Sequence, residues 1–214
     1  MKKLLLTGLL FTFIVNLNAQ TNLYEHPQFD QISKDHRTIA IVPFKTKVKL
    51  RPKQMKDISS EQLDRIEKAE GEGIQTALYS WFLKRKKRGD MKTVEIQDSR
   101  TTTAILSKND INYNNITNYT PQELAKILGV DSVISGNFET NKPMSEGASI
   151  ALAFLGAWGS TNSAVINMSV HNAEDGTLLW NYNKKVKGGL GSSSEDLINV
   201  LMRKASRRLS YTKS

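Results

Sequence analysis

Apolar and polar residues change periodicity several times along the chain, which predicts strands and helices in alternation. Five segments have the pattern of strands, namely residues 38–44, 93–96, 132–138, 164–171 and 177–186. The first segment, TIAIVPF, is an apolar run typical of a buried strand, and Pro43 suits its end because proline has no N–H to donate. The last two segments flank Asp175-Gly176, a hairpin signal, so we expect them to pair antiparallel.

Apolar residues at helical spacing predict helices at residues 60–88, 99–106, 121–128 and 194–209. The third helix has the strongest local signal, with Thr120 as its cap, Glu123 three residues later and Gly129 as its stop. In the first helix, which Ser59 or Ser60 can cap, Gly71 and Gly73 mark either a weak point or a close packing contact.

These elements predict one α/β domain over residues 37–214, with a mixed sheet of about five strands and helices packed on its faces. An extended N-terminal arm at residues 20–36 precedes the domain, and an apolar insert at residues 144–161 interrupts it. We expect a solvated loop at residues 45–56. A single core should contain Leu128, Val133, Trp180 and Leu201.

The first nineteen residues have the order of a cleaved signal peptide. Lys2 and Lys3 precede an apolar run at residues 4–15, and the small residue Ala19 follows it. The run is shorter than the roughly 20 residues of a membrane-spanning helix. We therefore expect an exported protein, periplasmic or associated with the outer envelope; the alternatives are a buried N-terminal helix and an uncleaved anchor.

The amino-acid composition excludes several kinds of site chemistry. The 214 residues contain no cysteine, which excludes disulfides, thiolate metal sites, a cysteine nucleophile and lipidation of a cysteine. Thirty Lys and Arg against 21 Asp and Glu give a net charge of +9. For an exported protein this charge favours contact with an anionic envelope polymer, a membrane or an acidic protein, and no nucleic acid is expected.

Motifs of catalysis are missing from the sequence. The three histidines, His26, His36 and His171, are scattered and show no spacing that collects metal ligands. No serine lies in a nucleophile motif such as Gly-x-Ser-x-Gly. We therefore expect no enzyme, no metal and no cofactor, with an enzyme of unrecognised type as the third alternative for the function.

Two segments have the composition of contact surfaces. Residues 147–159 are uncharged and apolar although they connect two predicted strands, and the candidate contact residues are Ile150, Phe154, Leu155 and Trp158. This segment can fill the core, contact a second copy or a protein partner, or insert in a membrane. The candidate polyanion patch is Lys84, Arg85, Lys86, Lys87 and Arg88. Its alternative role is to complement the negative end of the helix dipole.

Four motifs carry a family resemblance: IAIVPF at residues 39–44, Asp98-Ser99-Arg100 before a short helix, residues 123–136 (ELAKILGVDSVISG) and residues 174–180 (EDGTLLW). Together they resemble bacterial envelope proteins of the curli-secretion component superfamily, which is similar to the penicillin-binding-protein activator lipoproteins and to the N-terminal domain of TolB. The resemblance implies an anticodon-binding-domain-like α/β fold used for protein contacts and assembly.

The expected function is therefore that of a non-catalytic, exported envelope protein that acts through protein-protein contacts or self-assembly, as an accessory to envelope assembly or secretion. The alternative is a periplasmic module that binds a polyanion or another ligand through its basic patch. Because the chain lacks the lipidation cysteine of the lipoproteins that it resembles, a lipid anchor is not expected.

Overall fold

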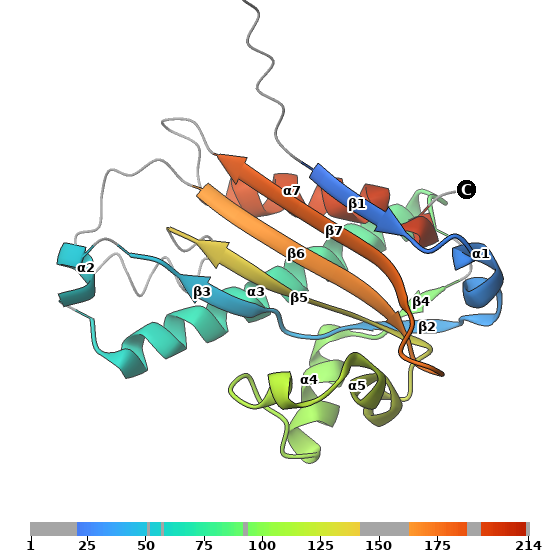
Figure 1. The fold of residues 1–214 in the computed structure, drawn as a ribbon, viewed down its shortest axis with the longest axis horizontal. Helices are drawn as coiled ribbons and strands as arrows, with labels where there is room; N and C mark the ends of the chain where they lie inside the picture. The colour runs from blue at the N-terminus through green and yellow to red at the C-terminus, as the bar shows by residue number, and fades with distance from the viewer. Residues whose placement is uncertain are drawn as a thin grey trace, which may run out of the picture.

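A seven-stranded mixed sheet forms the centre of the computed structural model, which describes residues 21–50, 52–56, 58–91, 94–141, 163–187 and 194–212 (Figure 1). The strands are β1 (Thr21–Glu25), β2 (Thr38–Ile41), β3 (Lys45–Val48), β4 (Glu95–Ile96), β5 (Ser132–Thr140), β6 (Ser163–Asn172) and β7 (Leu178–Lys187). Their order is β1-β7-β6-β5-β2-β4, and β3 also pairs with β5. The strands from β1 to β5 in this order are antiparallel, whereas β2, β3 and β4 make parallel pairs.

Helices cover both faces of this sheet. They are α1 (Phe29–Ile32), α2 (Pro52–Lys56), α3 (Ser60–Lys87), α4 (Ser99–Lys108), α5 (Pro121–Leu128) and α7 (Ser194–Arg208), with short 3-10 turns η1 (Ser33–Asp35), η2 (Ile116–Asn118) and η3 (Ser210–Thr212). In Figure 1, α3 and α7 run behind the strands, while α4 and α5 pack near β2 and β5. This arrangement confirms the predicted α/β fold with a mixed sheet and helices on its faces. Among the described residues, no helix combines the length and the apolar character needed to span a membrane.

Two apolar clusters lie on opposite faces of the sheet. Trp180 and Leu201 belong to the larger cluster, beneath α3 and α7. Leu128 and Val133 belong to the smaller cluster, beneath α4 and α5. The expectation of a single core around these four residues is therefore wrong, because side chains alternate across a strand and a sheet covered on both faces encloses two layers.

The helix termini follow the local signals in the sequence. Ser59 forms a capping box with Gln62 at the start of α3, and Thr120 forms one with Glu123 at the start of α5. Gly129 ends α5 with a φ of 67°, a left-handed conformation that glycine adopts without a steric penalty.

Two segments expected to lack regular structure contain strands. The segment expected to be an extended arm forms the edge strand β1, paired with β7, followed by α1. The segment expected to be a loop contains β3 and α2. In β3 the buried Thr46 and Val48 alternate with Lys45 and Lys47. The sequence was interpreted as a solvated loop because of its lysines, although the two-residue alternation of a strand is present. The predicted signal peptide and apolar insert lie outside the described residues.

Gly71 is a close packing contact. A Cβ added at Gly71 would lie 2.2 Å from the backbone oxygen of Phe44, which ends the short break between β2 and β3. The N–H of Phe44 donates to the oxygen of Gly71 at 3.4 Å. The missing side chain therefore lets α3 approach the break in the strand backbone to backbone, which decides between the two expectations for this glycine.

A buried polar network joins the segment before β2 to the last turn of the chain. The Nε2–H of His36 donates to Asn172 Oδ1 at 3.2 Å, which leaves Nδ1 to accept from the Tyr211 hydroxyl at 2.5 Å. Burial lowers the pKa of His36, although the charge of Asp131 raises it in part. Burial also lowers the pKa of His171 on β6. The fold therefore favours both histidines in the neutral form.

The stability of the protein should fall as the pH drops below about 6.5. Because the folded-state pKa values of His36 and His171 lie below the unfolded value, the unfolded chain binds protons first and the stabilising contribution of these histidines is lost. Urea unfolding between about pH 7 and pH 5 tests this result, since the carboxylates titrate mainly at lower pH. The variant His36→Gln with His171→Gln should lose this pH dependence; an unchanged slope would contradict the assignment.

Candidate functional site

The structure places one of the two predicted contact surfaces. Ile150, Phe154, Leu155 and Trp158 lie outside the described residues, so the apolar surface stays a prediction. The basic run occupies the last turn of α3 and the residue after it. The candidate site therefore consists of residues 84–88 and of the residues that pack against them.

The five cationic side chains of residues 84–88 lie in different surroundings. Arg85 is buried, whereas the others are exposed. Lys84 holds its ammonium 4.3 Å from the centre of the Trp81 ring, and Lys86 forms an ion pair with Glu95. The five residues therefore do not form one continuous patch, because a helix turn directs consecutive side chains around its axis.

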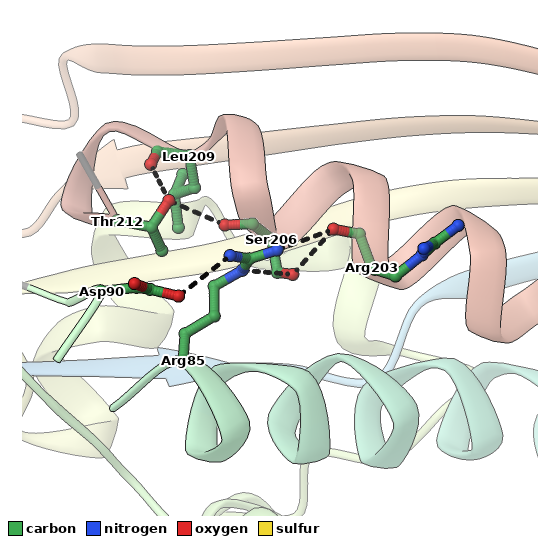
Figure 2. Close-up of polar contacts among 6 residues, drawn as sticks. All are labelled: Arg85, Asp90, Arg203, Ser206, Leu209 and Thr212. Atoms are coloured by element: carbon green, nitrogen blue, oxygen red, sulfur yellow. Dashed lines mark hydrogen bonds and ion pairs between the residues drawn. The ribbon is translucent and has the colours of Figure 1, made fainter. Parts of the chain in front are cut away.

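Arg85 is held in place by α7, as Figure 2 shows. Its Nε–H donates to the Ser206 hydroxyl at 3.0 Å, and its second terminal nitrogen donates to the backbone oxygen of Arg203 at 3.1 Å. The other terminal nitrogen lies 3.7 Å from the Asp90 carboxylate. Only 9% of the side chain is exposed. The guanidinium is therefore positioned before any ligand arrives.

The end of α7 has its own polar closure. The Thr212 hydroxyl lies near two backbone oxygens, at 2.8 Å from that of Ser206 and 2.6 Å from that of Leu209 (Figure 2). These contacts satisfy carbonyl groups that the helix terminus leaves without helical partners. The turn that contacts Arg85 is thereby fixed.

A cleft of about 360 Å³ lies between the C-terminal parts of α3 and α7. Its lining residues are Trp81, Arg85, Arg88, Asp90, Arg203, Lys204 and Arg207. Five of these side chains are cationic and one is a carboxylate, so the cleft has an excess of positive charge. Arg203 and Arg207 are exposed, so their guanidinium groups can reach a ligand from solvent.

Electrostatics in the cleft follow from this crowding of cations. Burial lowers the pKa of Arg85, the charge of Asp90 raises it, and the nearby Arg207 and Arg88 lower it further. An arginine stays protonated in proteins nonetheless. The cations therefore repel one another, and an anion that enters between them relieves this repulsion.

Sequence reasoning missed the contribution of α7. Arg203 and Arg207 are four residues apart on a helix whose apolar stripe was recognised, and Lys204 lies beside them. That spacing was the available signal for a cationic face. What the sequence did not show is that this face lies beside the end of α3, more than one hundred residues earlier in the chain.

The described residues hold no group of three or more histidine, aspartate or glutamate side chains that could bind a metal ion. His36, which precedes β2, and His171 of β6 are half-buried and are not among the residues that line the cleft. The chemistry of the cleft is accordingly that of guanidinium and ammonium groups, which bind anions by charge and by hydrogen bonds.

The structure is a mixed α/β domain with a cationic cleft between α3 and α7. No protein-family model and no curated protein matches the chain. Among solved structures, it is similar to the lipoprotein GNA1162 from Neisseria meningitidis, with 14% identity and a TM-score of 0.44 over 81% of this chain and 99% of that one.

Two further solved structures show a comparable likeness. The PelC dodecamer from Paraburkholderia phytofirmans has 9% identity and a TM-score of 0.43, over 86% of this chain and 93% of that one. The C-terminal domain of LpoB from Salmonella enterica has 9% identity and a TM-score of 0.33, over 75% and 93%. With such low identities and TM-scores, these likenesses assign neither a family nor a function.

Proposed function

We propose that the protein is an exported envelope protein that acts by binding and not by catalysis, and that the cleft between α3 and α7 binds an anionic group of its partner. The observation that carries the proposal is the gathering of five cationic side chains in one cleft with a single carboxylate. The cations come from α7, from the last turn of α3 and from the residue after it. Such a gathering costs stability through repulsion, and a bound anion offsets that cost.

A phosphate-bearing polymer of the envelope is the partner that the cleft favours. Guanidinium groups donate two parallel hydrogen bonds to phosphate oxygens, and the exposed Arg203 and Arg207 of the cleft lining add such donors to the buried Arg85. The backbone of Arg203, and not its side chain, accepts from Arg85. Its side chain can therefore be removed without breaking the contact that positions Arg85.

Binding of inorganic polyphosphate, measured by isothermal titration calorimetry, tests the proposal. The variant Arg203→Ala with Arg207→Ala should bind at least about tenfold more weakly, since a hydrogen bond to a charged group contributes about 1.5 to 3 kcal/mol. Affinity of the unchanged protein should fall as salt is added, because salt screens exposed charges.

The matched control is Lys86→Ala with Lys87→Ala, which removes the same charge from the same region of the surface but lies outside the cleft lining. We expect this variant to retain most of the affinity. Equal losses in both variants would show that only net charge matters. Polyphosphate that fails to bind the unchanged protein at low salt would overturn the proposal.

A further inference from the structure

Four asparagines form a row across the sheet face that is turned away from α3 and α7, which is the near face in Figure 1. Asn137 of β5 is the register partner of Asn167 of β6, which is the partner of Asn183 of β7, which is the partner of Asn22 of β1. Side chains directly opposite one another on paired strands share a face. The row therefore presents four amide groups at the spacing of strands, about 4.8 Å.

A second polar row lies beside the first. Ser135, Ser169, Asn181 and Tyr24 are register partners across the same four strands. The amide nitrogen of Asn181 donates to Asn167 Oδ1 at 2.7 Å and to the Ser169 hydroxyl at 2.9 Å. Because Asn167 accepts through its oxygen, its own N–H groups face away from Asn181. The Asn167 amide is thus oriented by Asn181, with its N–H groups directed away from that neighbour and toward other partners.

A pocket of about 220 Å³ lies at the β5 end of the two rows. One wall is polar and comes from the sheet, where Ser135, Asn137, Asn167 and Ser169 line it. The other wall is largely apolar and comes from the break after β2 and from the η2 to α5 region, where Pro43, Ile116, Tyr119 and Leu124 line it. A pocket with one amide and hydroxyl wall and one apolar wall matches a sugar ring, which has hydroxyl groups at its rim and C–H groups on its face.

The side chains of the two rows are uncharged, which favours a neutral ligand. The two rows consist of asparagine, serine and tyrosine side chains. Lys45 lines the pocket, but its ammonium lies 4.2 Å from the centre of the Tyr113 ring and 3.5 Å from the Tyr113 backbone oxygen. An extended peptide would be held through backbone pairing at a sheet edge, whereas these rows lie on a face.

We propose that the pocket and the asparagine row bind a neutral, extended, β-linked glycan, with one sugar ring in the pocket and the following sugars along the row. Acetamido groups suit the row because an amide of the ligand can both donate to and accept from an asparagine side chain. This site is separate from the cationic cleft, so either can fail without the other.

Titration with chitohexaose, a neutral β-linked chain of N-acetylglucosamine, tests the proposal by NMR or calorimetry. We expect binding at millimolar concentration or tighter, with little dependence on salt. Asn137→Ala with Asn167→Ala should weaken this binding at least tenfold. The control Asn114→Ala, an exposed asparagine outside both rows, should leave it unchanged.

Chain length tests the direction of the glycan. Asn22→Ala with Asn183→Ala removes the far end of the row, so it should weaken chitohexaose but not chitobiose, which reaches only the pocket. Thermal melting of each variant confirms that its fold is intact. The proposal would be overturned if the protein did not bind chitohexaose, or if Asn137→Ala with Asn167→Ala bound it as tightly as the unchanged protein. It would also be overturned if these variants lost self-association and kept glycan binding.

Discussion

Replacing Gly71 by alanine should lower the free energy of unfolding by about 3 kcal/mol, as expected when an atom is forced into a filled space. The added Cβ would lie 2.2 Å from the Phe44 backbone oxygen and 3.2 Å from the Tyr113 ring. A backbone atom between two strands cannot move aside as a flexible side chain can. Helix α3 would have to shift away from the sheet, which urea unfolding of the variant would measure.

Gly73 provides the matched control on the same helix. This glycine is only half-buried, so Gly73→Ala should raise the free energy of unfolding by about 0.5 to 1 kcal/mol through helix propensity. Opposite signs for the two substitutions are the expected result. A Gly71→Ala protein as stable as the unchanged one would contradict the close contact between α3 and the break after β2.

Replacing Trp180 by alanine should lower the free energy of unfolding by about 3 to 5 kcal/mol. The side chain is fully buried and its ring stacks on Tyr182 with centres 5.6 Å apart. Its indole N–H also donates to the backbone oxygen of Arg208, the last residue of α7, at 3.1 Å. The substitution therefore removes both core volume and a polar contact that holds the end of α7 on the sheet.

Trp180→Phe separates these two contributions. Phenylalanine keeps most of the packing but has no N–H, so the Arg208 oxygen loses its donor and the loss should be about 1 to 3 kcal/mol. Urea unfolding gives both values. A loss for Trp180→Phe as large as that for Trp180→Ala would mean that packing at this position contributes little.

Local signals in the sequence predicted the elements whose ends are fixed locally. The Thr120 and Glu123 box, the Gly129 stop and the Asp175-Gly176 turn each act within a few residues, so the sequence suffices to place them. β1 escaped prediction because an edge strand is stabilised by backbone pairing and exposes most of its side chains, which removes the apolar period.

The candidate sites depend on contacts that periodicity does not specify. The basic run was evident in the sequence, but its division and the addition of Arg203 and Arg207 follow from the packing of α3 against α7. The asparagine row needs the register of four strands at once, and a shift of one residue in any of them would turn its amide to the other face. The periodicity of a segment predicts which of its residues share a face, whereas the elements that pack against that face depend on the fold of the whole chain.

The pairing of β1 with β7 also determines the order in which the sheet is completed. Lys184 of β7 donates to the hydroxyl of Thr21 of β1, a partner 163 residues earlier in the sequence. The hairpin of β6 and β7 closes a far shorter loop and offers β1 the edge on which it pairs. An early segment of the chain must therefore wait for the last strand, and its amide protons should exchange with solvent well before those of the β6–β7 ladder.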